Sequence, residues 1–288
     1  MNDASTYILR LARHVAAPYI AHPHLQAIMV TGSAADGSAD YQSDLDLIAY
    51  YAELPSEEDL AAACRGNRGA NHAWLFNERQ NGSIAEAYDV YGVQCQVMHS
   101  TIGAWEQHMA TVLEQLDVTS PLQKALSGIL KCIPLHGEDQ IRRWQARAAA
   151  YPDALARAMV EHYLQFSALW GLSEYLEPRD AMLWRYQMTL ENAQNILGVL
   201  AGLNRQYYTT FQFKRMRHFI AGLEIAPSNL AARLEYLFEA EARASSLELE
   251  ELVRETVALV EQHMPQIDTA RGRRRIGWRR EAWQPVAE

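Results

Sequence analysis

Two neighbouring stretches decide the fold, Val30-Thr31-Gly32-Ser33 and Ser43-Asp44-Leu45-Asp46-Leu47. The first ends an apolar, β-branched run that begins at Leu25, and the second begins another that continues to Tyr51, so each predicts a buried strand. Ten residues lie between Ser33 and Asp44 and are expected to form a short loop. Because side chains alternate along a strand, the two aspartates leave one face while the leucines beside them point into the core.

The residue types in these stretches suit a bound nucleotide. Gly32 has no Cβ, so the chain can turn sharply after the first strand and bring its backbone close to a ligand. Ser33 offers a hydroxyl and a backbone N–H, both suited to a phosphate oxygen. Asp44 and Asp46 supply the paired carboxylates that Mg²⁺ uses when it bridges to a triphosphate. Either half alone is commonly a turn or a solvated strand end, but the order and spacing together predict a metal–nucleotide site.

These stretches closely resemble the core motif of the DNA polymerase β-like nucleotidyltransferase superfamily. The order of predicted elements is similar to that of its antibiotic-modifying members, the aminoglycoside and lincosamide nucleotidyltransferases. The resemblance implies an enzyme that transfers a nucleoside monophosphate, with AMP expected, from a nucleoside triphosphate to a hydroxyl of a small molecule. It assigns Asp44 and Asp46 to Mg²⁺ and to catalysis, and it assigns Gly32, Ser33 and Ser43 to the triphosphate, with ATP the expected co-substrate.

Superfamily members carry a third acidic residue on a later strand, and this sequence departs from that pattern. The matching strand, residues 93–100, has Gln94 and Gln96 on the face where the acid is expected. Glutamine neither takes a proton from a hydroxyl nor neutralises a second metal ion. Glu86 and Asp89 on the partner strand are the nearest substitutes, so both are candidate catalytic residues, although exposed strand and turn acids are the plainer interpretation of each. Equal alternatives come from the helical region: Glu161, Glu174 and Glu191.

Lys214 is the expected contact for the far end of the triphosphate. It is one of three lysines, and it follows an aromatic segment, residues 207–213, that leads into a predicted helix. The resembling enzymes often bring a lysine from this part of their helical domain onto the triphosphate. A solvated helix lysine is an equally good interpretation of the same residue.

The spacing of apolar residues predicts an α+β chain. Helices are expected at 6–21, with Ser5 or Thr6 as N-cap, and at 56–65; strands are expected at 73–77, 84–90 and 93–100, the last two joined by the turn Tyr91-Gly92. From Ile102 onward the pattern is helical: 154–176, 181–203, 214–223 and 230–260. We expect a mixed-sheet nucleotidyltransferase domain at 1–117, an all-helical bundle at 118–265 and a basic tail at 266–288.

Composition and charge narrow the class of partner. The net charge is −9; residues 271–288 hold six arginines and two glutamates, so that segment carries +4 and residues 1–270 carry −13. An acidic body argues against nucleic acid as a partner, and the tail is expected to pack on that body. Three cysteines without a Cys-x-x-Cys pair indicate a reducing compartment. No apolar stretch reaches the ~18 residues that a membrane span needs, so we expect a cytoplasmic protein.

Three functions compete. The first is transfer to a small-molecule hydroxyl, with an antibiotic as a candidate acceptor and antibiotic resistance as the role; an acidic cleft would concentrate a cationic acceptor such as an aminoglycoside. The second keeps the transfer but makes a protein the acceptor. The third is a non-catalytic nucleotide-binding or regulatory module, motivated by Gln94 and Gln96. The oligomeric state stays open, a homodimer included.

Overall fold

The computed structural model describes residues 2–281 and 283–284, and the chain divides into two compact units. Unit 1 comprises residues 1–117 and 122–150, and unit 2 comprises residues 118–121 and 151–288. Unit 1 holds a mixed sheet with helices on both faces, and unit 2 is helical. The predicted α+β class, with a mixed sheet in the N-terminal half and helices after it, is therefore confirmed.

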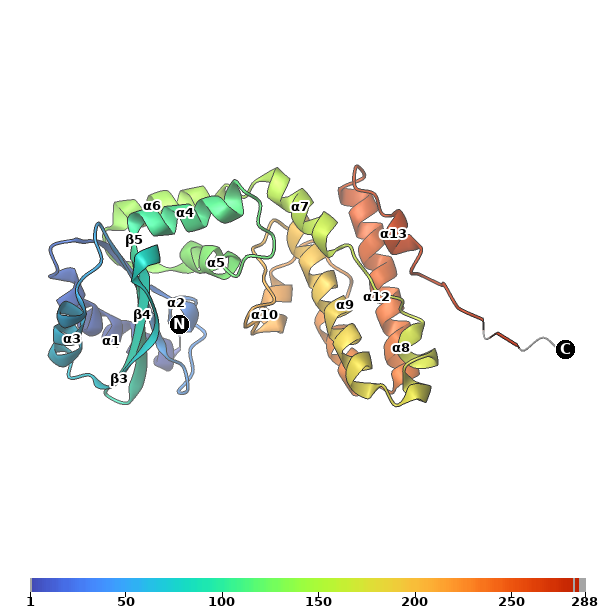
Figure 1. The fold of residues 1–288 in the computed structure, drawn as a ribbon, viewed down its shortest axis with the longest axis horizontal. Helices are drawn as coiled ribbons and strands as arrows, with labels where there is room; N and C mark the ends of the chain where they lie inside the picture. Colours follow the sequence, from blue (N-terminus) through green and yellow to red (C-terminus); the bar gives the residue numbers. More distant parts are fainter. Residues whose placement is uncertain (1, 282, 285–288) are drawn as a thin grey trace. The chain divides into compact units, whose positions relative to one another are not determined.

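The sheet of unit 1 has six strands in the order β3-β4-β5-β2-β1-β6 (Figure 1). The strands are β1 (Leu25–Thr31), β2 (Leu45–Tyr51), β3 (Ala70–Glu78), β4 (Ser83–Val90), β5 (Val93–Thr101) and β6 (Ile133–His136). β2 and β5 run parallel, and the other neighbours are antiparallel. The two predicted strands of the opening motif thus lie side by side in the middle of the sheet.

Helices cover each face of the sheet with a separate apolar core. α1 (Asp3–Ile20) and α3 (Glu57–Gly66) pack on the face that carries Leu45 and Leu47. α4 (Ile102–Leu113), α5 (Gln123–Lys131) and α6 (Glu138–Ala149) belong to the other face, where the Tyr50 ring lies 5.7 Å from Trp105 of α4 and 4.6 Å from Trp144 of α6. The aspartates of β2 share the face of Tyr50, because residues 44, 46, 48 and 50 alternate with the leucines.

Local sequence explains where the N-terminal helices begin. α1 starts three residues before its expected start, because the Asn2 side chain accepts a hydrogen bond from the backbone N–H of Ser5 and caps the helix. α3 begins with a capping box, in which Ser56 and Asp59 each bond the other's backbone N–H.

Tyr91 and Gly92 both have positive φ, as a tight hairpin between β4 and β5 requires. A four-residue helix, α2 (Gly32–Ala35), follows β1, and a 3₁₀ turn (Arg79–Asn81) follows β3.

The structure moves the expected boundary after residue 117, because the chain returns to the sheet. β6 pairs antiparallel with β1, with Val30 opposite Ile133, and α5 and α6 flank it in unit 1. The sequence gives little sign of this strand, since it is four residues long and contains Pro134. Proline lacks the N–H of a ladder hydrogen bond and is tolerated where β6 lies, at the edge of a sheet.

Unit 2 consists of helices, and the long helix expected at 154–176 is wrong. The helices are α7 (Asp153–Tyr163), α8 (Gly171–Glu174), α9 (Met182–Leu203), α10 (Met216–Ala221), α11 (Leu230–Glu239), α12 (Ala242–His263) and α13 (Ala270–Arg273), with a 3₁₀ turn at Glu177–Arg179. Between α7 and α8 the chain is irregular, and Asn192 of α9 accepts from the backbone N–H of Ser167 and holds it there. Residues of this connection stay buried, Phe166 and Leu169 among them, so the apolar spacing continues where the helix does not.

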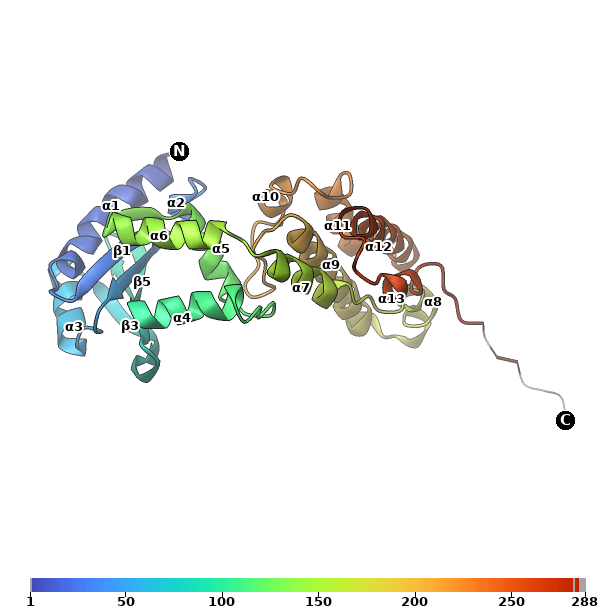
Figure 2. The same ribbon diagram turned by 90° about the horizontal axis from the view of Figure 1, so that it is seen from above.

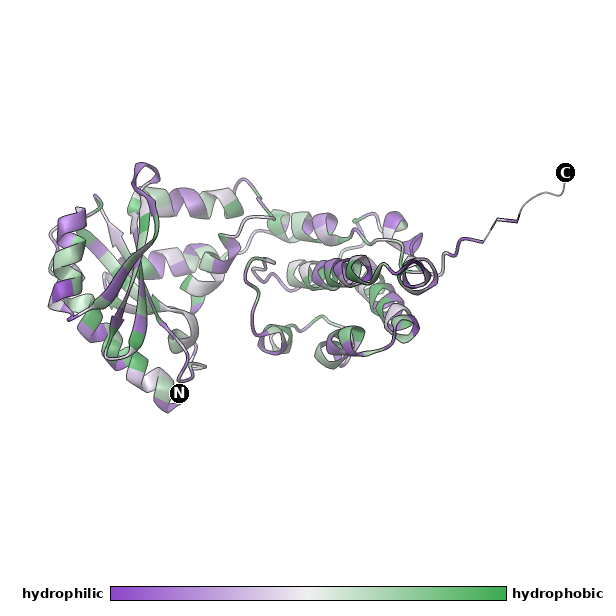
Figure 3. Cartoon of the chain, turned by 60° about the horizontal axis from the view of Figure 1, so that its bottom comes forward, coloured by the Kyte–Doolittle hydropathy of each residue, from purple (hydrophilic) through white to green (hydrophobic). Residues whose placement is uncertain are grey.

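The long helices of both units show mixed hydrophobic and hydrophilic residues along their length, as expected for helices with one buried face (Figure 3). Figure 2 shows the same helices from above. In the part of the chain that the structure describes, no helix combines the length and the apolar character needed to cross a membrane. The expectation that the tail packs on acidic residues of the chain itself is confirmed for two arginines: Arg273 pairs with Glu261, and Arg279 reaches Glu250 at 3.0 Å.

Candidate active site

Asp44 and Asp46 stand where β2 begins, next to the end of β1. Thr31, the last residue of β1, is the antiparallel partner of Asp46. Both aspartates are half-buried, and the leucines between and after them are fully buried on the opposite face. Asp46 lies on the face of β2 opposite these leucines, and Asp44 immediately precedes the strand.

Gly32 brings the backbone against one of these carboxylates. Its φ is +68°, in the left-handed region that favours glycine, and a Cβ added there would overlap Oδ2 of Asp46 and lie 3.1 Å from its Cγ. Any other residue would push this carboxylate aside. At the start of α2, only glycine therefore leaves space for the Asp46 carboxylate beside the backbone.

Ser33 and Ser43 occupy the two ends of the connecting loop. Ser33 is half-buried, and its carbonyl accepts from the backbone N–H of Ser38. Ser43 lies beside Asp40: its hydroxyl donates to the Asp40 carboxylate at 3.0 Å and accepts from the Asp40 backbone N–H at 3.0 Å. Ser43 thus fixes the turn that leads into Asp44, and its assignment to the triphosphate stays a prediction.

Gln96 is the residue that stands beside the aspartates on β5. In the parallel pairing of β2 with β5 it is the partner of Asp46, and its Nε2 donates to Oδ2 of Asp44 at 2.7 Å. Nε2 also lies 3.3 Å from Oε1 of Gln94, two residues earlier on the same face. The position expected to hold a third acid is therefore held by the side-chain amide of Gln96.

Glu86 does not join this site, so its prediction as a substitute catalytic acid is wrong. Its cross-strand partner on β5 is Val97, which points to the opposite face from Gln96. The Glu86 carboxylate is fully buried and accepts from Tyr19 at 2.7 Å, while Nε2 of His72 lies 2.7 Å away and Nε2 of His99 lies 3.2 Å away. Burial acts to raise the pKa of Glu86, but the hydrogen bond and charge of His99, with the bonds from Tyr19 and His72, outweigh it and hold the pKa below its usual value.

Asp89 lies on the same face as the aspartates but at a distance. Its cross-strand partner is Gln94, and β4 is two strands away from β2. At about 4.8 Å per strand, this separation is roughly 10 Å. The Asp89 carboxylate accepts from Nδ2 of Asn71 at 2.7 Å. Asp89 is thus a half-buried acid tied to β3, and a catalytic role for it stays a prediction.

The remaining candidates belong to unit 2. Lys214 is exposed and follows an aromatic cluster in which the rings of Tyr208, Phe213 and Phe219 lie 5.3 to 5.6 Å apart. This cluster orders the segment before the lysine. Among the alternative bases, Glu191 accepts from Gln187 at 2.8 Å. Contact of these residues with the triphosphate stays a prediction.

Gly128 of α5 is a neighbour of the site that the sequence did not single out. A Cβ at this position would lie 2.8 Å from the Thr31 hydroxyl, so the helix approaches the end of β1 through its glycine. The available signal was a glycine inside an amphipathic pattern, which commonly marks a close backbone approach.

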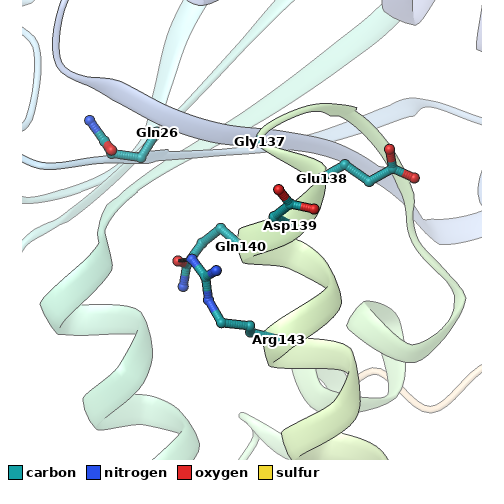
Figure 4. A pocket seen from close by; sticks show the side chains of 6 residues that line it. All are labelled: Gln26, Gly137, Glu138, Asp139, Gln140 and Arg143. Carbon is teal, nitrogen blue, oxygen red and sulfur yellow. Dashed lines mark hydrogen bonds between the residues drawn. The ribbon is translucent and has the colours of Figure 1, made fainter.

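The pocket lined by Gln26 and the start of α6 lies elsewhere in unit 1 (Figure 4). Gln26 is near the beginning of β1, whereas the aspartates adjoin its end. Within residues 2–281 and 283–284, no group of three or more His, Cys, Asp or Glu side chains is arranged to hold a metal ion.

No family model matches the sequence, and no curated protein matches it. Among solved structures, the chain is similar to a nucleotidyltransferase-like protein from Exiguobacterium sibiricum 255-15. The two share 11% sequence identity over 90% of this chain and 80% of that chain, with a TM-score of 0.43. A likeness of this size carries no statement about activity, so the function is argued from the residues of unit 1.

Proposed function

We propose that this protein is a metal-dependent nucleotidyltransferase that moves a nucleoside monophosphate from a nucleoside triphosphate to a hydroxyl of a small molecule. ATP is the expected donor. The observation that carries the proposal is the contact of Gly32 with Asp46: a strained backbone position, open only to glycine, lies directly against one of two carboxylates that share a strand face. Such close approach of backbone to a polar group is typical of a site that receives a phosphate.

The donor atoms present fit one Mg²⁺ ion. Asp44 and Asp46 would hold it, because hard carboxylate oxygens are the ligands that Mg²⁺ prefers and phosphate oxygens complete its shell. When bound, the ion would neutralise charge on the transferring phosphate. Gly32 leaves room for the Asp46 carboxylate, and the hydroxyl and N–H of Ser33 would orient the phosphates.

The acceptor is proposed to be a small molecule, with a cationic antibiotic as the first candidate. The support is the net charge of −13 over residues 1–270, which favours association with cations. If the acceptor were a protein, AMP would be found on a polypeptide rather than on a small molecule. The same labelled nucleotide distinguishes the two acceptors, because the label shows which product carries the AMP.

The test is transfer of label from α-³²P ATP or GTP, with Mg²⁺, to a panel of hydroxyl-bearing antibiotics. Asp44→Asn and Asp46→Asn should each abolish transfer and leave the melting temperature nearly unchanged, because an amide is a poor Mg²⁺ ligand and both side chains are partly exposed. Glu58→Gln, which removes an exposed carboxylate of α3, is the control. Retention of most of the activity in either of the first two variants would contradict the metal assignment.

A second candidate, a nucleotide-binding module without transfer activity, is favoured by Gln96 in the place of the third acid. It predicts that Mg²⁺ and triphosphate together raise the melting temperature, as any ligand of the native state does, while no acceptor becomes labelled.

A further inference from the structure

The side-chain amide of Gln96 contacts the carboxylate pair directly, in addition to standing where a proton acceptor was expected. It is the direct neighbour of Asp46 in the parallel pairing of β2 with β5, and its nitrogen lies 2.7 Å from Oδ2 of Asp44. The Gln96 amide therefore neighbours both carboxylates: it stands beside Asp46 through the strand pairing, and it donates a hydrogen bond to Asp44.

The orientation of this amide is fixed by its neighbours. Nε2 of Gln96 carries two protons and donates to two acceptors, a carboxylate oxygen of Asp44 and, at 3.3 Å, Oε1 of Gln94. Turning the amide over would place its oxygen against the Asp44 carboxylate, which is repulsive. Asp44 thus holds Gln96 as a donor, and Gln94 turns its own amide oxygen toward the same nitrogen.

A donor at this position opposes a second cation. Two-metal sites place their ions roughly 3.5–4 Å apart and need anionic ligands to offset the repulsion between them. Here the aspartates supply two negative charges, and an N–H of Gln96 occupies an Asp44 oxygen that a second ion would need. The amide N–H places a partial positive charge against the Asp44 carboxylate, as a cation would, at far lower charge.

We propose that Gln96 is a positioning residue that makes this a one-metal site: a single divalent ion binds at Asp44 and Asp46 with the nucleotide, and the Gln96 amide takes the place of the second ion. This inference rests on the proposed function, because it assumes that a nucleotide and a metal bind there. It differs from that function in naming the number of ions and the residue that sets it.

The experiment uses Mn²⁺ with α,β-methylene ATP, which binds without being cleaved, and counts ions by electron paramagnetic resonance. The wild-type complex should retain one Mn²⁺ per chain and give the spectrum of an isolated ion. Gln96→Glu should retain two and add the spin-coupled signal of a close Mn²⁺ pair, because a third carboxylate then stands beside Asp46.

Gln94→Glu is the matched control, since it adds the same charge two residues away and keeps an oxygen facing the Gln96 amide. It should retain one ion. A spin-coupled Mn²⁺ pair in the wild type would overturn the inference about Gln96. A second ion in Gln94→Glu but not in Gln96→Glu would overturn it too. Either result would leave the nucleotidyltransferase proposal intact. If the wild type bound neither the nucleotide nor Mn²⁺, the proposed function itself would fail. Melting curves of all three proteins show that each is folded.

Discussion

Gly32 ties the conformation of the backbone to the position of a carboxylate. Two separate properties require glycine there, the positive φ and the lack of room beside Asp46. Gly92 shares only the first property: its φ is +82°, and a Cβ would meet nothing within 4 Å. The two positions therefore separate backbone strain from steric displacement of the Asp46 carboxylate.

Gly32→Ala should lower the transfer rate by about 10²-fold or more, because displacement of a reacting group by about 1 Å has that cost. It should also remove the rise in melting temperature produced by Mg²⁺ and triphosphate. Gly92→Ala should lose about 1–2 kcal/mol of unfolding free energy through backbone strain alone and keep both properties. Equal nucleotide binding in the two alanine variants would show that the contact with Asp46 is irrelevant to the site.

Glu86 contributes stability that depends on pH. Its pKa in the folded protein is lowered, so the contribution is fully present above the unfolded-state pKa of about 4.3 and is lost as the pH falls through the folded-state value. Glu86→Gln should cost about 1.5–3 kcal/mol of unfolding free energy at pH 7, as removal of hydrogen bonds to a charged group does. Urea unfolding of both proteins should show that the difference narrows below pH 4.

The control for Glu86 is Glu58→Gln in α3. The Glu58 side chain is 80% exposed and pairs with Arg65 at 2.7 Å, so the change should alter the unfolding free energy by less than about 1 kcal/mol at any pH. A difference for Glu86→Gln that stays constant from pH 7 to pH 3 would mean that folding does not lower the pKa of Glu86.

The strands show what a single sequence can and cannot predict. β1, β2 and β5 alternate or end in β-branched residues, and their bounds lie within one residue of those expected. β4 is buried on both faces along nearly its whole length, so no alternation indicated which face receives Glu86. The register of β5 against β2 is a non-local property, and for that reason the sequence could not distinguish Gln96 from Gln94 as the neighbour of Asp46.

α3 offers a test of a single helix terminus. Ser56→Ala removes the hydroxyl that accepts from the Asp59 N–H at 3.1 Å, and loss of an N-cap costs about 1 kcal/mol. Urea unfolding should show this loss, and Ser56→Asp, which restores an oxygen acceptor at the cap, should recover most of it. Equal stability of the alanine and aspartate variants would show that the capping box adds nothing.

The complete chain is needed for the prediction that concerns Lys214, because the lysine and the aspartates belong to different units. Lys214→Ala should raise the apparent KM for triphosphate about tenfold, as loss of one charge-assisted bond does, and leave the KM for the acceptor unchanged. Arg217→Ala, which removes a cation paired with Glu235 in the same segment, is the control. Identical kinetics of the two variants would leave Lys214 as a solvated lysine in the segment before α10.

The outer strand β3 has a consequence for how the protein behaves at high concentration. All nine of its residues are exposed, and Trp74, Leu75 and Phe76 make it an apolar edge that could template growth into fibres. Its pairing with β4 shifts register twice, between Ala70 and Ala73 and between Trp74 and Phe76. Bulges of this kind bend and twist an edge, so a second chain cannot extend the ladder in a straight line. The irregularity of β3 is thus a safeguard against amyloid-like assembly, built into the strand most exposed to it.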